Sequence, residues 1–171
     1  MDAPRTFQRF HDDHARVLER LDALEQMLAA SGDGPIDAGL EAAVLRSIDL
    51  LGRQFATHMR AEEEVLFPVL GRLSGVAAMV EPLVAEHADL RQMLADLARR
   101  IDRPAGAARD QQIRVELRDL IDLLRLHVHK EEATVFRVTE QVLDAEEFDA
   151  VAARLEATRN DFPLDSRRSL S

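Results

Sequence analysis

The chain has 171 residues, of which 46% are apolar and 32% are charged, the balance of a soluble globular protein with one hydrophobic core. Its formal net charge of −10 disfavours nucleic acid or an anionic membrane surface as a partner. The absence of cysteine excludes disulfides, thiolate ligands and iron–sulfur clusters, so any metal must be held by histidine and carboxylate. No apolar run reaches membrane-spanning length and the first residues do not resemble a signal peptide, so we expect a cytoplasmic protein.

Apolar side chains recur every three or four residues along four long segments, which is the period of an amphipathic α-helix. A shorter fifth helix is expected from Asp144, where Asp-Ala-Glu-Glu resembles a capping box, to about Arg159. Clusters rich in glycine or proline separate the long segments. The long segments run over about residues 6–30, 37–70, 76–101 and 108–138.

The chain contains two copies of a helical hairpin. Aligning His14 with His87, and His58 with His127, superposes the apolar stripes of the two halves. Short turns between long helices favour antiparallel neighbours, so we predict an all-α fold, namely an up-down-up-down antiparallel four-helix bundle with a short extra C-terminal helix. The predicted parts of this single domain are the bundle, residues 1–143, and the extra helix with a polar tail, residues 144–171.

Polar residues interrupt the apolar stripe of each long segment. Each stands where the helix should bury leucine or valine, and an ionised carboxylate in such a place must be paired or bind a metal. Antiparallel packing sets an early position of one helix against a late position of the next, so these residues should meet near one end of the bundle interior, within about one helical turn (~5 Å). The residues are His14, His58, Glu62, His87, His127 and Glu131.

Four imidazoles and two carboxylates at one point make a site for two metal ions, and this donor set suits iron, zinc or manganese. Each ion would take two histidines, and the two glutamates would be shared as bridges. A bridging oxide or hydroxide would still leave each ion an open position for a small ligand. Two other interpretations stay open. A single buried histidine is more often a hydrogen-bonded core residue, and Glu62 and Glu131 could pair with a buried arginine, for which Arg91 is the candidate.

The pattern of one histidine followed by His-x-x-x-Glu, present twice, resembles the hemerythrin-like or HHE cation-binding domain family over about residues 8–140. The resemblance implies a non-haem di-iron centre that has two iron ions and a bridging oxide or hydroxide, with zinc or manganese able to substitute. It also implies that the centre binds or reduces O2, or acts on peroxide or nitric oxide. The implied iron ligands are His14, His58, His87 and His127, and the implied bridges are Glu62 and Glu131.

Two positions differ from the oxygen-carrying members of that family. Those members have a fifth histidine where this chain has Arg91, and an aspartate where it has Glu131. The set of four histidines and two glutamates is more similar to bacterial and iron-sensing HHE domains and to iron–sulfur-cluster repair proteins, which counts against simple oxygen carriage. The His-x-x-x-Glu spacing also differs from the Glu-x-x-His motif of ferritin-like bundles.

Several neighbours of these residues have open roles. His11 could edge the site but is favoured as a surface residue, and His129 is expected to point away. Glu63, Glu64 and Glu132 are either solvated or contact the ligands from outside. No classical enzyme activity is expected.

A second function is compatible with the same residues. The chain could be a non-catalytic, iron-responsive binding module in which metal orders the bundle for a protein partner. Residues 144–171 are not needed to build the site, so they are the expected interaction surface in that case.

Overall fold

The computed structural model describes residues 5–73 and 75–160, and every regular element among them is helical. The all-α prediction is therefore confirmed for this part of the chain, while the predicted polar tail lies outside the described residues. The elements are α1 (Arg5–Ala30), α2 (Ala38–Ala61), η1 (Glu62–Leu66), α3 (Phe67–Leu70), α4 (Ala77–Ile101), α5 (Ala107–Lys130), η2 (Glu131–Val135), α6 (Phe136–Val142) and α7 (Ala145–Asn160).

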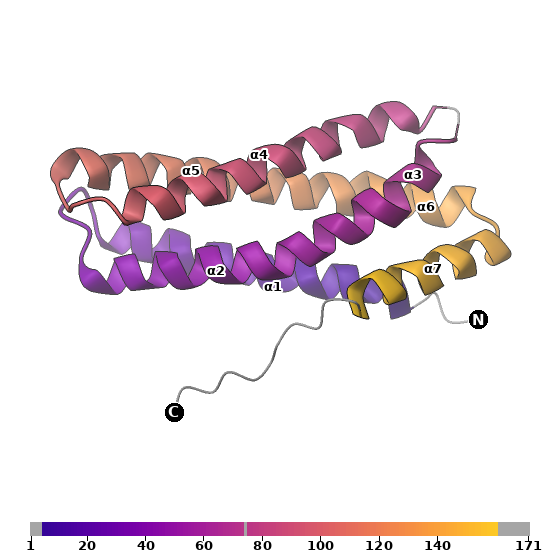
Figure 1. Cartoon of the computed structure of the whole chain (residues 1–171), viewed down its shortest axis with the longest axis horizontal. Helices are drawn as coiled ribbons and strands as arrows, with labels where there is room; N and C mark the ends of the chain where they lie inside the picture. Colours follow the sequence, from indigo (N-terminus) through magenta and orange to yellow (C-terminus); the bar gives the residue numbers. More distant parts are fainter. Residues whose placement is uncertain (1–4, 74, 161–171) are drawn as a thin grey trace.

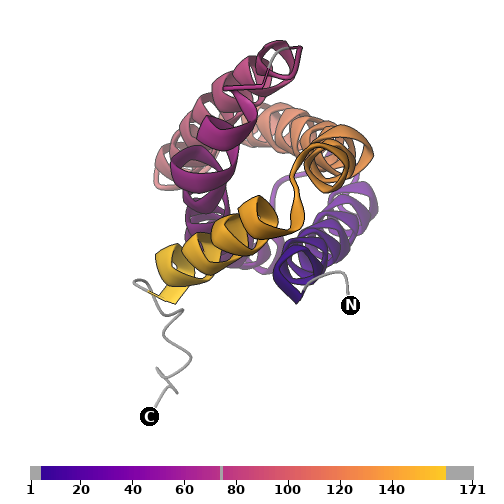
Figure 2. The same ribbon diagram turned by 90° about the vertical axis from the view of Figure 1, so that its right-hand side faces the viewer.

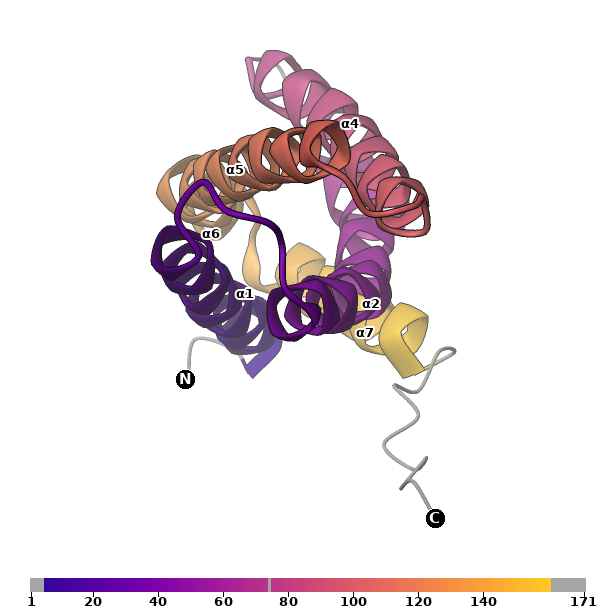
Figure 3. The ribbon, with the colours of Figure 1, turned by 90° about the vertical axis from the view of Figure 1, so that its left-hand side faces the viewer.

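The long helices α1, α2, α4 and α5 lie side by side along the longest axis of the molecule (Figure 1). Contacts link α1 with α2, α2 with α4, α4 with α5, and α5 with α1, so each long helix packs against two others. Seen from the end that holds the turns after α1 and α4, the four surround a common interior (Figure 3). Within the described residues, no helix has the length and apolar character needed to cross a membrane.

Helix α7 crosses the opposite end of the molecule (Figure 2). It packs against α1, α2 and η1, and its Val151 and Leu155 are buried there. The predicted capping box at its start is present, because the Asp144 carboxylate accepts hydrogen bonds from the backbone N–H groups of Glu146 and Glu147, at 3.0 and 2.9 Å. The Glu147 side chain accepts in return from the backbone N–H of Asp144. The fifth helix thus begins where the sequence predicts it.

The second and fourth predicted helices each contain a wide turn that the sequence pattern did not predict. η1 and η2 are π-helical, and the carbonyls of Glu62 and Glu131 accept hydrogen bonds from the N–H groups of Phe67 and Phe136, five residues on. A π turn takes up one extra residue and shifts the buried face beyond it by one position. Val69 and Val138, which would continue the stripes of a regular α-helix, are therefore only half-buried. The fully buried residues at these heights are Leu70 and Thr139.

The apolar interior falls into two clusters on either side of the polar residues. One lies toward the turns after α1 and α4 and includes Leu21, Leu51 and Leu120, and the other lies under α7 and includes Phe7 and Leu66. Each cluster is built from the apolar stripes of several helices, which exclude water from both sides of the layer between them. The polar layer is therefore enclosed within the core.

Buried ionic groups of α5 tie the turn after α1 to that helix. The guanidinium of Arg114 donates to Ser31 Oγ and to the carbonyl of Gly34, at 2.5 and 2.7 Å. The carboxylate of Asp110 accepts from the backbone N–H of Ile36 at 3.0 Å and from Arg109 at 3.0 Å. Each of these bonds satisfies a polar group that packing removes from water. This network fixes the register of α1 and α2 against α5.

Candidate metal centre

The structure brings all six predicted site residues together in the layer between the two apolar clusters. They come from α1, α2, η1, α4, α5 and η2, and none exposes more than 2% of its surface. The two carboxylates are completely buried, which is costly unless a cation compensates for their charge. The residues are His14, His58, Glu62, His87, His127 and Glu131.

The four histidines form two pairs, one from each half of the chain. His14 Nε2 lies 3.0 Å from His58 Nε2, and His87 Nε2 lies 3.0 Å from His127 Nε2. Two ring nitrogens that face each other at this distance must share a proton or converge on a cation, since two lone pairs would repel. The sequence repeat is therefore reproduced as two matching half-sites.

Each buried glutamate turns one oxygen toward each histidine pair. Glu131 Oε2 is 3.1 Å from His14 Nε2, and its Oε1 is 3.0 Å from His127 Nε2. Glu62 Oε1 is 3.4 Å from His58 Nε2, and its Oε2 is 3.5 Å from His87 Nε2. Both carboxylates thus lie between the two half-sites.

The donor set fits metal cations. None of the four oxygens of Glu62 and Glu131 has a hydrogen-bond partner of good geometry among the described residues. Leaving a buried acceptor without a partner costs about 1–3 kcal/mol, and more when it is charged. Atoms of Glu62, His87, His127 and Glu131 lie within 4.8 Å of one another, and so do those of His14, His58 and Glu131. Divalent cations would satisfy all four oxygens at once.

A comparison with protein-family models matches residues 5–139 to the Hemerythrin HHE cation binding domain. The chain belongs to this family. Comparisons with curated proteins and with solved structures found no match. The matched region contains every residue of the buried cluster, and together the two findings support a metal-binding, hemerythrin-like protein.

Carboxylates outside the hemerythrin-like centre hold the far side of the histidine rings. Because a carboxylate only accepts hydrogen bonds, three of these contacts place a ring proton on Nδ1 and direct Nε2 inward, where a metal would bind. They are His14 Nδ1 with Glu132 at 2.7 Å, His87 Nδ1 with Glu63 at 2.8 Å and His127 Nδ1 with Glu86 at 3.0 Å. Asp13 lies 3.7 Å from His58 Nδ1, which is an ion-pair distance too long for a hydrogen bond.

When no metal is present, the surrounding charges raise the pKa of His14, His58 and His127 and lower the pKa of Glu131. Burial is the largest single effect on His14 and His127 and opposes their charge, but close contacts with Glu131 and with the outer carboxylates together raise the pKa of both rings. Burial likewise opposes charge on His58, and the nearby carboxylate of Glu62 raises its pKa well above the usual value. Burial would raise the pKa of Glu131, yet its contacts with the histidines hold that pKa well below the usual range. A metal must therefore displace protons.

Arg91 does not neutralise the buried glutamates, so the alternative interpretation that pairs it with Glu62 or Glu131 is wrong. Its guanidinium is 2.9 Å from Glu63, and its side chain is 43% exposed. His11 contacts the centre indirectly through Glu132, with Nδ1 2.7 Å from the carboxylate.

Sequence reasoning missed Asp13 and Glu86 as partners of the ligands. Both can be found in hindsight, because each directly precedes the first histidine of its hairpin, His14 or His87. The sequence left the roles of Glu63 and Glu132 undecided, and the structure places each carboxylate against a buried histidine of the cluster.

Phenylalanine rings enclose the imidazoles. Phe55 stacks on His58, with ring centroids 5.1 Å apart, and Phe136 stacks on His14 at 5.6 Å. Phe67 occupies the corresponding place on His87 at 5.5 Å. Apolar walls lower the local dielectric and so strengthen the interactions of any ion held inside.

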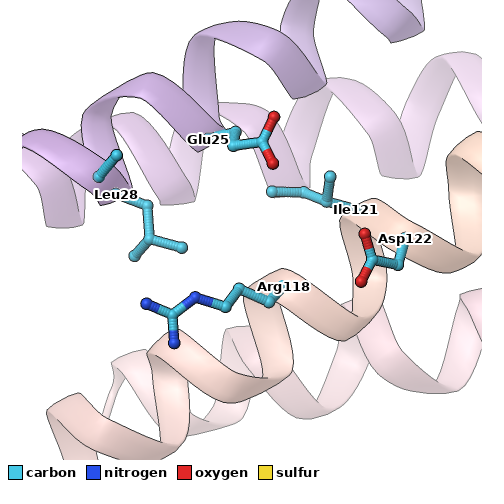
Figure 4. A pocket seen from close by; sticks show the side chains of 6 residues that line it. Glu25, Leu28, Arg118, Ile121 and Asp122 are labelled. Carbon is cyan, nitrogen blue, oxygen red and sulfur yellow. The ribbon is translucent and has the colours of Figure 1, made fainter.

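A surface hollow between α1 and α5 is separate from the centre (Figure 4). Its lining includes Glu25, Leu28, Arg118, Ile121 and Asp122, none of which is among the six buried ligands. It offers charged side chains of both signs, and no unsatisfied buried group is among them. This hollow therefore adds no residue to the buried cluster.

Proposed function

We propose that this protein is a hemerythrin-like non-haem di-iron protein that binds or reacts with O2, or with peroxide or nitric oxide, in sensing, scavenging, redox or repair work. The proposal includes the up-down-up-down four-helix bundle and the cytoplasmic location expected from the sequence. The observation that carries it is the orientation of Glu62 and Glu131, each with one oxygen toward either histidine pair.

The same geometry supports two ions that share both carboxylates. Each ion would receive two imidazole nitrogens and one oxygen from each glutamate, which makes four protein donors. A bridging oxide or hydroxide would add a fifth, and a small ligand could take an open position. Imidazole with carboxylate is a donor set that iron accepts, and zinc or manganese could also occupy it. When bound, iron would supply the electrons for chemistry on the small ligand.

The protein's own groups would position and protect that chemistry. The outer carboxylates fix the ring orientations of the histidines, as the 2.7 Å contact of Glu132 with His14 illustrates. Phe55 and Phe136 cover two of the rings and exclude bulk water. Arg91 stands at the place of the fifth histidine, with its guanidinium engaged by Glu63, which supports sensing or redox work over simple carriage.

A second candidate function is an iron-responsive binding module without gas chemistry. The observation that favours it is the packing of α7 against η1, the segment that begins at Glu62. Loss of metal would leave the carboxylate of Glu62 buried without compensation, and relaxation of η1 would loosen α7. A partner that binds α7 would then distinguish the metal-bound protein from the metal-free protein.

The test loads the metal-free protein with ferrous iron under anaerobic conditions, measures iron per chain, and then admits air while the absorption spectrum is recorded. Two irons per chain and new near-ultraviolet charge-transfer bands in air are the expected result. Two irons with no change in air would favour the binding module. No tight iron, or a single zinc, would refute the di-iron assignment.

A further inference from the structure

The carboxylates that hold the histidines differ in what lies outside them. Three are paired with a fixed cation, whereas Glu132 is paired with an imidazole. Among the described residues, no arginine or lysine contacts Glu132. The pairs are Asp13 with Arg16 at 3.4 Å, Glu63 with Arg91 at 2.9 Å, Glu86 with Lys130, and Glu132 with His11 at 2.7 Å.

Exposure follows the same division. The side chain of Glu132 is 34% exposed and that of His11 is 39% exposed, so solvent reaches both. Asp13 and Glu86 are only 14% and 13% exposed. Glu63 is more open, at 27%, but the guanidinium of Arg91 lies against it and repels cations. Within residues 5–73 and 75–160, the pair of His11 and Glu132 is thus the one place where a solvent-exposed carboxylate of the centre is paired with an imidazole, which can be neutral and bind a metal, rather than with a fixed cation.

We propose that His11 and Glu132 form the port through which divalent cations enter the centre, and that they deliver the ion first to the half-site of His14 and His58. The inference rests on the proposed metal centre. The incoming ion is captured by the imidazole of His11 and the carboxylate of Glu132, two groups that commonly bind divalent metals.

Capture of an ion by His11 and Glu132 also allows the ion to move on toward the buried centre. Glu132 holds His14 Nδ1 at 2.7 Å, so a carboxylate that turns toward an ion releases the ring of His14. Phe136 packs against both rings, with centroids 5.3 Å from His11 and 5.6 Å from His14, and forms a common apolar wall beside the path. Once the ion has passed, the bond between Glu132 and His14 can re-form and close the site.

The test measures how fast cobalt(II) enters the metal-free protein by stopped-flow absorption, together with the final stoichiometry. His11→Arg gives Glu132 the kind of fixed cation that Glu63 and Glu86 already have. This substitution should slow loading about tenfold at low ionic strength, because the added positive charge repels an incoming divalent ion. The slowing should be smaller at high salt, which screens that repulsion. His11→Ala, which adds no charge, should slow loading several-fold through loss of the capturing imidazole. Both variants should still bind two ions per chain.

The matched control is His129→Arg, the same substitution at an exposed histidine of α5. It adds the same charge to the protein and should load at the rate of the unaltered chain. Loading of both His11 variants at the unaltered rate would overturn the port, as would equal slowing in His11→Arg and His129→Arg. Failure of the unaltered chain to bind cobalt at all would overturn the proposed metal centre together with the port. Far-ultraviolet circular dichroism verifies that each variant is folded.

Discussion

Replacing Glu63 by glutamine isolates the contribution of an outer carboxylate to metal affinity. Glu63 lies 2.8 Å from His87 Nδ1, and its side chain is 27% exposed. Loss of such a partner of a metal-ligating histidine typically costs 10–100-fold in affinity, or about 1.4–2.8 kcal/mol. The amide oxygen of glutamine can still accept from Nδ1, but a neutral bond has about half the strength of a charge-assisted one. We therefore expect a loss near the lower limit, about tenfold.

The effect should be confined to one half-site. His87 faces His127 at 3.0 Å, whereas the other half-site is held from outside by Glu132 and Asp13. A two-step titration with a chelator of known affinity, which competes for cobalt or ferrous iron, should show one weakened step and one unchanged step. Arg91 would lose its charged partner at the same time, but its side chain is 43% exposed and water can replace that contact.

Glu64→Gln is the control, because it removes the same charge from the next position of the chain. The side chain of Glu64 is 60% exposed, and its carboxylate lies 3.9 Å from Arg60. An exposed ion pair of this kind contributes little. Equal metal affinities for Glu63→Gln and Glu64→Gln would refute the assignment of Glu63 as a positioning residue. A tenfold loss in Glu63→Gln alone would support it.

Three further outcomes follow from the same geometry. Saturation of both positions at about 100 times their dissociation constants should stabilise the fold by about 2.7 kcal/mol per ion, and so raise the unfolding midpoint by about 10–20 °C in calorimetry, with full reversal by a chelator. Metal affinity should rise with pH, because the raised pKa values of His14, His58 and His127 keep protons on rings that the metal must displace; a pH-independent affinity in competition titrations would contradict this. At the far end, the hydrogen bond from the backbone N–H of Ile36 lowers the pKa of Asp110 in the folded protein. The ionised Asp110 carboxylate therefore stabilises the fold fully above its unfolded pKa of about 3.9, and this stabilisation is lost as the pH falls through the lower pKa of the folded state. Asp110→Asn should cost about 1–3 kcal/mol in urea unfolding at pH 7, and the difference from the unaltered chain should shrink in acid.

The helices and the six buried polar residues could be predicted because both depend on periodicity. A histidine such as His14 in an otherwise apolar stripe is visible in the sequence, and the repeat in the second half of the chain shows that it is no isolated exception. The N-cap at Asp37 is a local feature too, since its side chain accepts a hydrogen bond from the backbone N–H of Leu40 at 2.8 Å. Local patterns fix these features before any packing takes place.

The outer contacts could not be predicted in this way, because they join residues far apart in the chain. Glu132 reaches His14 across 118 positions, and Glu86 reaches His127 across 41. Apart from the acidic residue that precedes the first histidine of each hairpin, the sequence around these carboxylates does not distinguish them from solvated charges. The relative rotation of packed helices decides which carboxylates meet a ring, and that rotation is a property of the assembled core.

The π turns connect the fold to the chemistry most directly. Each begins at a buried glutamate of the cluster, and the carbonyl of that same residue accepts a hydrogen bond from the N–H of Phe67 or Phe136 five positions on. Those two phenylalanines stack on His87 and His14, ligands that belong to the opposite half of the chain. In a regular α turn the face would be out of phase by one residue, and the aromatic ring would not stand over the imidazole. A rare helical geometry at the same place in both repeats is therefore explained by the need to place a carboxylate in the centre and an aromatic cover beside it.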